Sequence, residues 1–187
     1  MKKKFTSKVT EIIMLTSNVG KLREFQLQFP MMDCEKGRDI LEVMGTPEEV
    51  ILYKSIEAGK GYAVEDTILT VNGVEQVDIK YTRDKVVKQG DKLEWITNVG
   101  FNDGNTIFIF SGITKGTADL TRRDKRPEFA FEDFFIPEGS NRTLVELGPN
   151  KILHSARTDA VTKMLEGKVD ASFEIKEVPV WAGTYQQ

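Results

Sequence analysis

Cysteine, histidine and long apolar runs are all scarce in this chain of 187 residues. Cys34 is the only cysteine and His154 the only histidine, which excludes an internal disulfide and a metal cluster of several cysteines. A single thiol suits a reducing compartment. No apolar stretch approaches the roughly 20 residues that span a bilayer, and the run at residues 12–15 is too short for an export signal. We therefore expect a cytoplasmic protein with no membrane role.

Charge of one sign is equally scarce. The formal net charge of the chain is only −3, so the sequence predicts no general electrostatic attraction for nucleic acid or anionic lipid. The basic loop Arg122–Arg126 is a local cluster that could bind an RNA or DNA end, and this stays a weaker alternative. We expect no nucleic-acid partner.

The composition is that of one globular domain. Apolar residues make up 40% and charged residues 29% of the chain, and a domain of about this length buries roughly two thirds of its extended surface. No internal repeat and no linker rich in proline, glycine and serine interrupts the sequence. We therefore predict a single α/β domain over residues 1–187.

Periodicity and turn signals predict alternating strands and helices. Strands are expected at residues 11–16, 61–64, 68–71 and 106–116, with an extended segment at 172–181. Helices are expected at residues 22–29, 46–59, 92–99 and 156–166. Three local signals support these boundaries: the capping box that Thr46 forms with Glu49, the turn at Asn72-Gly73, and Ser155 as an N-cap. An acidic corner is expected at residues 65–67.

A loop of small polar residues follows the first expected strand. The segment Thr16-Ser17-Asn18-Val19-Gly20-Lys21 leads into a helix N-terminus, where free backbone N–H groups and the helix dipole favour anions. Lys21 adds a full positive charge, so the loop is a candidate triphosphate site. It is not a Walker A loop, because the two glycines and the Lys-Ser/Thr ending are missing. An ordinary capped turn is the alternative.

Acidic residues gather at two places in the sequence. Glu65 and Asp66, followed by Thr67, end an apolar segment, and Glu42 precedes the second expected helix. Mg²⁺ prefers oxygen ligands and keeps several waters, so one or two of these carboxylates would be enough to hold it. A carboxylate here could also orient or deprotonate an attacking water. The alternatives are a turn or helix cap at residues 65–67 and a solvated position for Glu42.

A third group of candidate residues surrounds the start of the last expected helix. Lys151, His154, Ser155 and Arg157 lie there, and a lysine or arginine at this place could reach a phosphate or the carbonyl edge of a base. The aromatic segment Phe129–Phe135 could stack on the base. The alternative is structural, because a lone histidine and an aromatic run are often parts of a core.

Taken in order, these motifs resemble the family of inosine and xanthosine triphosphate pyrophosphatases over most of the chain. The segments that carry the resemblance are the loop Thr16–Glu24, Glu42, Lys54, Val64-Glu65-Asp66-Thr67, Ile79-Lys80-Tyr81 and the signature Phe135-x-Pro137-x-Gly139-x-x-x-Thr143. Each segment is short and common on its own, and their order along the chain is what is specific.

The resemblance implies that the chain hydrolyses a purine nucleoside triphosphate between its α- and β-phosphates, with Mg²⁺ as cofactor. The implied catalytic residues are Lys21, Lys54 and Asp66, with Asp66 as general base. The implied metal ligands are Glu42, Glu65 and Asp66, and the implied triphosphate contacts are Thr16, Ser17, Asn18 and Thr67. The resemblance also implies an elongated mixed α/β fold of two lobes, with the nucleotide in the cleft between them, and a homodimer.

The sequence departs from the family where the base would bind. The family's Phe-Gly-Trp/Tyr-Asp-Pro motif appears as Phe129-Ala130-Phe131-Glu132-Asp133, and its Ser-His-Arg motif as Ser155-Ala156-Arg157. The implied substrate contacts in this part are Phe129, Phe131, Glu132, Lys151, Ser155 and Arg157. Because the phosphate and metal positions are intact, we expect hydrolysis with an open base preference. The alternative is a nucleotide-binding sensor or sequestering protein with little or no turnover.

Overall fold

The computed structural model describes residues 3–76, 87–123 and 131–186. Three of the sequence-based expectations lie outside this part of the chain: the base contact Phe129, the family segment Ile79-Lys80-Tyr81, and residues 124–127 of the basic loop. Within the described residues, no helix is both long enough and apolar enough to cross a membrane.

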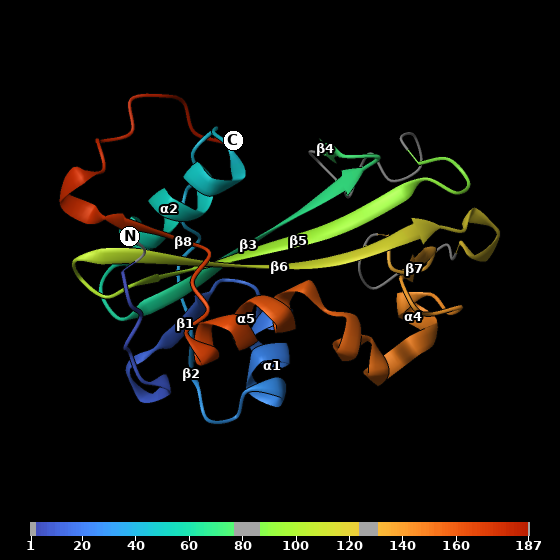
Figure 1. The fold of residues 1–187 in the computed structure, drawn as a ribbon, viewed down its shortest axis with the longest axis horizontal. Coiled ribbons are helices and arrows are strands. Elements are labelled where there is room, and N and C mark those ends of the chain that lie inside the picture. Colours follow the sequence, from blue (N-terminus) through green and yellow to red (C-terminus); the bar gives the residue numbers. More distant parts are fainter. Residues whose placement is uncertain (1–2, 77–86, 124–130, 187) are drawn as a thin grey trace. The chain divides into compact units, whose positions relative to one another are not determined.

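A mixed sheet of eight strands forms the centre of the described chain (Figure 1). The strands are β1 Ile13–Thr16, β2 Asp33–Lys36, β3 Tyr62–Val71, β4 Val74–Gln76, β5 Lys92–Asn102, β6 Thr106–Ala118, β7 Phe135–Pro137 and β8 Ala171–Glu174. Their order is β2-β1-β3-β5-β6-β7, while β4 pairs with β3 and β8 with β6. β1 runs parallel to both of its neighbours, and the hairpin and C-terminal pairings are antiparallel.

Helices accompany the sheet, which confirms the predicted mixed α/β class. The α-helices are α1 Val19–Gln28, α2 Pro47–Ala58, α4 Leu144–Leu147 and α5 Ala156–Glu166. Short 3₁₀ helices lie at Val9–Glu11, Leu120–Arg122, Gly148–His154 and Ile175–Glu177. Contacts group the elements into two compact units, one of Met1–Asp66, Asn98–Ser111 and Ala160–Gln187, the other of Thr67–Thr97 and Gly112–Asp159.

Alternating side chains of β6 build two cores in the first unit. Phe108 and Phe110 join a cluster with Phe25 of α1 and with residues of α5, and Phe5 meets both β6 rings edge to face. The intervening Ile107 and Ile109 join a second cluster with apolar residues of α2. Because successive strand residues point to opposite faces, α1 and α5 cover one face of the sheet and α2 the other (Figure 1).

The second unit has an aromatic core of its own. Leu69 of β3, Leu93 of β5 and Ala118 of β6 pack with a group of phenylalanines, of which Phe131 and Phe134 meet edge to face at 5.2 Å between ring centroids. These rings are fully buried. Aromatic burial on this scale is the main stabilising contribution to the unit.

The local signals in the sequence predict their elements correctly. The Thr46 hydroxyl accepts a hydrogen bond from the Glu49 N–H, and the Glu49 carboxylate accepts one from the Thr46 N–H, as in a capping box. Asn72 and Gly73 have positive φ angles and connect β3 to β4. The Thr158 N–H donates to the Ser155 hydroxyl at the start of α5. Each of these signals is satisfied within a few residues of chain.

Two expectations about strands and helices are wrong. The helix expected at residues 92–99 is part of β5, because the β-branched and aromatic residues of this segment favour a strand and its second half is buried on both faces. The acidic corner at residues 65–67 is absent, since β3 continues without interruption from Tyr62 to Val71. The extended C-terminal segment begins as β8 but contains the 3₁₀ turn Ile175–Glu177.

Gly116 lies where β6 pairs with β7, the strand that the first residues of the family signature form. A Cβ atom at Gly116 of β6 would clash with the Ile136 carbonyl oxygen of β7 and lie 2.5 Å from a ring carbon of Phe135. We expect Gly116→Ala to lower the free energy of unfolding by about 2–3 kcal/mol, a typical overpacking cost, in urea titrations. Thr117→Ala is the control, because the Thr117 side chain is exposed. Equal effects of the two substitutions would contradict this account of the β6–β7 contact.

Candidate functional site

A polar cavity of about 200 Å³ lies in the first unit, where β1 and β2 end. The end of β1 and the loop after it line the cavity with Thr16, Ser17 and Asn18, and α1 lines it with Lys21. The loop after β2 contributes Arg38, Asp39 and Glu42, α2 contributes Lys54, and β3 contributes Glu65. In open α/β sheets, ligands bind outside the carboxyl ends of parallel strands. The cavity occupies that position, and most of the predicted phosphate and metal residues face it.

The loop between β1 and α1 is shaped by its own polar side chains. Asn18 is the N-cap of α1, and its side-chain oxygen accepts from the Lys21 N–H at 3.1 Å. The Asn18 N–H in turn donates to the Thr16 hydroxyl at 3.1 Å. The Ser17 hydroxyl donates to Asp39 at 2.8 Å, which joins this loop to the one after β2. The N-terminus of a ten-residue helix therefore lies at the cavity wall, where its dipole favours an anion.

Two ion pairs lie in the cavity. One joins α1 to β3, and the other joins α2 to the loop after β2. The Lys21 ammonium pairs with the carboxylate of Glu65, whose side chain is only 2% exposed. The Lys54 ammonium donates to the Glu42 carboxylate at 2.6 Å and to the Glu65 carbonyl oxygen at 3.1 Å. The buried Glu65 and the partly buried Glu42 thus each have a lysine partner, which offsets the cost of removing their charge from water.

The carboxylates around Lys54 change the pKa of its ammonium group. Burial alone would lower the pKa of an ammonium group, but the charge and hydrogen bond of Glu42 outweigh it, with further contributions from Glu65 and Asp66. The net result is a raised pKa. Lys54 therefore remains charged at neutral pH, hydrogen-bonded to the Glu42 carboxylate and within the field of Glu65 and Asp66.

Asp66 has the most perturbed carboxyl group of the site. Burial raises its pKa from 3.8 to about 6, the negative charges of Glu42 and Glu65 raise it as well, and Lys54 and Lys21 act in the opposite direction. A carboxylate with a pKa near 6 can accept a proton at neutral pH better than an ordinary aspartate. Perturbed groups of this kind gather at functional sites. The structure thus brings Lys21, Lys54, Glu42, Glu65 and Asp66 into one region.

Arg38 and Asp39 line the cavity although the sequence analysis did not select them. Arg38 pairs with Glu57 of α2, and both of these side chains are largely exposed. The signal that could have found them is positional, because β2 runs parallel beside β1 and the loops after both strands must leave from the same edge. β2 itself, with the sequence Asp-Cys-Glu-Lys, has no apolar pattern that identifies it as a strand.

No three acidic side chains are placed together as ligands of one metal ion in the described ranges. Mg²⁺ does not need such a cluster, since it usually takes one or two carboxylates with waters and substrate phosphates. The crowding of Glu42, Glu65 and Asp66, which raises the pKa of Asp66, is a surplus of negative charge that suits a divalent cation. The residues present therefore fit Mg²⁺.

The predicted base contacts that are described lie in the second unit. The Glu132 carboxylate pairs with the Lys151 ammonium at 3.2 Å. Ser155 caps α5 and Arg157 lies in its first turn, half-buried. Phe131 has a φ of 71° and is fully buried, with its ring at the edge of Trp95 and Phe134. As placed, its ring faces belong to the core, and a stacking role for Phe131 stays a prediction.

The remaining predicted contacts in the second unit serve local structure. The hydroxyl groups of Thr67 and Thr97 are hydrogen-bonded to each other at 2.8 Å. The His154 carbonyl oxygen accepts a hydrogen bond from the Thr114 hydroxyl. The role of Thr67 in phosphate binding stays a prediction.

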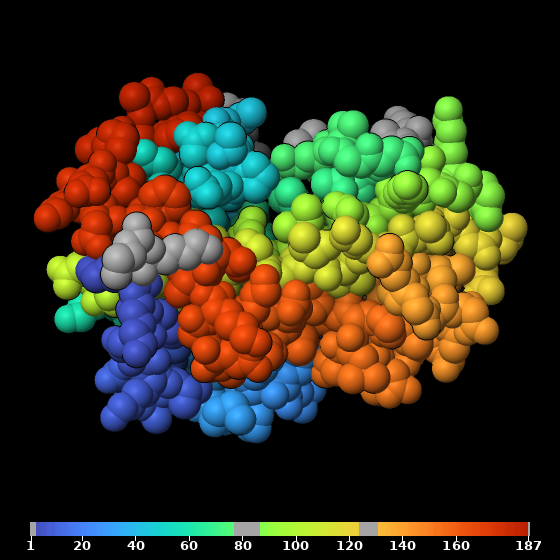
Figure 2. All heavy atoms as spheres, in the orientation of Figure 1, coloured from blue at the N-terminus to red at the C-terminus, as the bar shows by residue number. Residues whose placement is uncertain are grey.

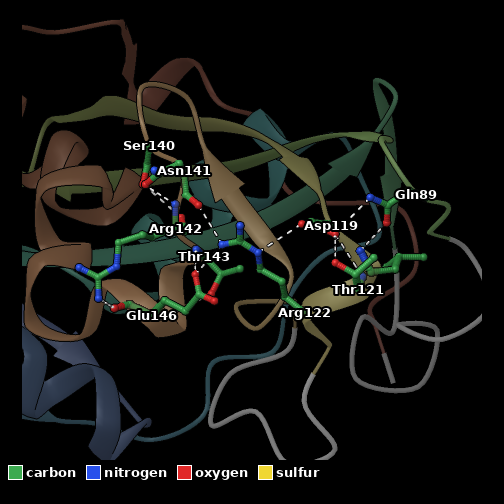
Figure 3. A network of polar contacts seen from close by, with 10 residues as sticks. Gln89, Asp119, Thr121, Arg122, Ser140, Asn141, Arg142, Thr143 and Glu146 are labelled. Atoms are coloured by element: carbon green, nitrogen blue, oxygen red, sulfur yellow. Dashed lines mark hydrogen bonds and ion pairs between the residues drawn. The ribbon is translucent and has the colours of Figure 1, made fainter.

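The family signature and the basic loop meet in one polar network (Figure 3). Thr143 and Glu146 form a capping box that opens α4. One Arg122 guanidinium nitrogen donates to the Asn141 carbonyl and to Glu146, both at 2.8 Å, and another lies 3.3 Å from Asp119. The Arg122 guanidinium is therefore engaged within the protein, which gives no support to a nucleic-acid site at this residue.

These features define a class: a mixed α/β protein with a charged cavity at the carboxyl edge of parallel strands. The family model of the Ham1 family matches residues 12–167, and the chain belongs to this family. The match confirms the resemblance to the inosine and xanthosine triphosphate pyrophosphatases.

A similar fold is found among solved structures. The structure of the Staphylococcus aureus Ham1 protein is similar, with a TM-score of 0.60 and 16% sequence identity, over 82% of this chain and 96% of that chain. At this identity the likeness concerns the fold. No curated protein matches the sequence.

The raised pKa of Asp66 predicts how the stability of the metal-free protein depends on pH. The folded chain binds this proton more tightly than the unfolded chain, so the free energy of unfolding falls as pH rises from about 4 to about 6 and stays lowered above. Two pKa units correspond to roughly 2–3 kcal/mol as an upper bound. We expect Asp66→Asn to raise the free energy of unfolding by about 1–2 kcal/mol at pH 7.5, and by little near pH 4.

Urea titrations in the presence of a chelator at both pH values check this prediction. Asp33→Asn is the control, because Asp33 is an exposed residue of β2 and its substitution should change stability little at either pH. A gain for Asp66→Asn that is equal at the two pH values, or a loss at pH 7.5, would contradict the assignment.

Proposed function

We propose that this chain hydrolyses a purine nucleoside triphosphate to a nucleoside monophosphate and pyrophosphate, with Mg²⁺ as cofactor. The observation that carries the proposal is one cavity in which Lys21 pairs with Glu65 and Lys54 with Glu42, while Asp66 follows Glu65 in β3. Membership of the Ham1 family supports a nucleoside triphosphate pyrophosphatase activity. We also propose a cytoplasmic homodimer, as the resemblance to the family implies.

The triphosphate binds at the cavity wall formed by the loop after β1. Lys21, Asn18 and the hydroxyl groups of Thr16 and Ser17 contact its oxygens, next to the N-terminus of α1. When the triphosphate binds, the two lysines exchange their carboxylate partners for phosphate oxygens. Lys21 and Lys54 pair with Glu65 and Glu42 in the structure, and phosphate oxygens compete for the same ammonium groups. A carboxylate that loses its lysine in this way becomes available to a cation.

Glu42 and Glu65 are the residues that hold Mg²⁺, with Asp66 next to them. When bound, the ion supplies positive charge for the triphosphate oxygens and for the charge that develops on them. The carboxylates fix its position on a strand and on a loop before α2, so that positioning and charge stabilisation are provided by rigid parts of the first unit.

Asp66 orients the attacking water and accepts its proton. The water oxygen forms a bond to the α-phosphorus, and the bond from that phosphorus to the oxygen bridging to the β-phosphate breaks. Pyrophosphate leaves with the bonding electron pair. A pKa of about 6 leaves Asp66 ionised at neutral pH, yet basic enough to take the proton. The Lys54 ammonium stabilises the negative charge of the phosphate chain.

The base is bound by the residues that the resemblance to the family implies. Arg157 donates to a carbonyl of the base, and the paired side chains of Lys151 and Glu132 present a donor and an acceptor. Such a set distinguishes bases by their hydrogen-bonding edges. Because Glu132 and Ala156 stand where the family has aspartate and histidine, we propose a base preference that differs from that of other family members.

A pyrophosphate-release screen tests the proposed function. Purified protein is assayed with ITP, XTP, GTP and ATP and their deoxy forms in the presence of Mg²⁺. We expect turnover of at least one purine triphosphate and a fall in kcat of about 10²–10⁴-fold for Asp66→Asn, the usual effect of losing a general base. Asp33→Asn, in the exposed strand β2, should retain wild-type kcat. Tight binding of a nucleotide with no turnover by the wild type would favour the sensor function instead.

Arg157 gives a separate prediction about base preference. Losing a well-placed donor opposite a buried carbonyl costs about 1–3 kcal/mol, so Arg157→Met should lower kcat/KM for a 6-keto base such as that of ITP by about tenfold relative to ATP. The measurement is the ratio of the two kcat/KM values. Arg142→Met is the matched control, since the Arg142 guanidinium donates to the Glu146 carbonyl. An unchanged ratio for Arg157→Met would remove Arg157 from the base site.

A further inference from the structure

The C-terminal residues 179–186, here called the strap, run alongside the segment that carries Glu42. The Gln186 N–H donates to the Glu42 carbonyl at 2.8 Å, and the Met44 N–H donates to the Thr184 carbonyl at 2.9 Å. Tyr185 and Val43 form an antiparallel bridge. Figure 1 shows the chain returning to the segment before α2, and Figure 2 shows red C-terminal atoms against cyan atoms of that region.

The strap supplies the backbone partners of residues 42–44, which lie in a loop. This loop is fixed at its start, where the Gly37 N–H donates to the Thr16 carbonyl at 3.1 Å, and at its end, where Thr46 opens α2. Between these points the strap hydrogen bonds hold the backbone at Glu42, and the Gln186 amide adds one to the Val43 carbonyl at 3.2 Å. The placement of the Glu42 side chain follows from this backbone.

Trp181 fixes the strap to α2. Its indole N–H donates to the Thr184 carbonyl at 3.0 Å, and its ring meets Tyr53 edge-on at 5.2 Å. The ring also lies against Gly45 and Gly183, since a Cβ at these positions would lie 3.1 Å and 2.8 Å from it. The Tyr53 hydroxyl donates to the Pro179 carbonyl at 2.7 Å. Tyr53 immediately precedes Lys54, so one turn of α2 contacts both the strap and Glu42.

We infer that the strap positions the Glu42 carboxylate against Lys54, and that Gln186 and Trp181 are positioning residues for the cation and phosphate site. The inference rests on the proposed function of that site. It concerns residues beyond the range 12–167 that matches the family model. Neither residue lines the cavity, and both act through the backbone of residues 42–44. Outer partners of metal ligands typically change metal affinity by 10–100-fold when they are removed.

Gln186→Pro and Gln186→Ala form the matched pair that tests the inference. Proline removes the backbone N–H that donates to Glu42, whereas alanine keeps it and removes only the side-chain contact. We expect Gln186→Pro to raise the Mg²⁺ concentration that gives half-maximal pyrophosphate release by about tenfold, and Gln186→Ala to change it less than twofold. In the metal-free protein, hydrogen exchange of the Met44 amide should accelerate in Gln186→Pro and stay as in wild type in Gln186→Ala.

Mg²⁺ binding measured by calorimetry separates this inference from the proposed function. If the wild type turns over no nucleotide, the proposed function fails, while calorimetry and amide exchange still decide on the strap. If Gln186→Pro does not fold, Trp181→Phe replaces it in the same assays, because phenylalanine keeps a ring but lacks the indole N–H, and a severalfold loss of Mg²⁺ affinity is expected. A folded Gln186→Pro or Trp181→Phe with wild-type Mg²⁺ affinity and wild-type exchange at residues 42–44 would overturn the inference.

Discussion

The parallel pairing of β1 with β2 on one side and β3 on the other is the constraint on which the site depends. Parallel strands end at a common edge, so the loops that follow β1 and β2 are brought together there. The register of β1 with β3, Ile13 opposite Tyr62 and Met14 opposite Ala63, carries β3 past the end of β1 at about Glu65. Three short pieces of chain that are distant in sequence therefore share one cavity wall.

Charge compensation follows from that geometry. The common edge collects carboxylates that are partly or fully removed from water, and each would be costly without a partner. Lys21 and Lys54 supply the compensation, while Asp66, with the weaker compensation, has its pKa raised. A triphosphate with a divalent cation carries both signs of charge and could replace these internal pairs one for one. The protein without ligand thus balances part of the negative charge of its site with its own lysine side chains.

Local signals made part of this structure predictable. The capping box at Thr46, the turn at Asn72-Gly73 and the cap at Ser155 depend on contacts within a few residues, and all three are confirmed. β2 could not be recognised in this way, because its mostly polar residues form a strand only by pairing with β1. The same dependence on distant pairing hid Arg38 and Asp39. The prediction of a helix at residues 92–99 was wrong, because the charged residues near β5 hid the strand preference of its β-branched residues.

The site itself was predicted in outline by the order of its motifs. The loop after β1 meets Glu42, Lys54 and Glu65 in one cavity. Glu65 reaches this cavity from the middle of a strand and not from its end, and Asp66 follows it in the same strand. The aromatic motif around Phe131 was ambiguous for a physical reason, since a phenylalanine that stacks on a ligand and one that fills a core look alike in sequence. The burial of Phe131 depends on Trp95 and Phe134, which no local pattern connects to it.

The segment Phe135–Thr143, which carries the family signature, has a structural role in this protein. Its first residues form the edge strand β7, Gly139 turns with a φ of 80°, and Thr143 starts α4. Each of these contacts is local to the fold. A homologue could therefore keep this stretch intact through selection for foldability alone, long after its catalytic carboxylates had been replaced. The charged residues at positions 21, 42, 54 and 66, by contrast, form ion pairs or carry a perturbed pKa in the first unit, of which this segment is not part.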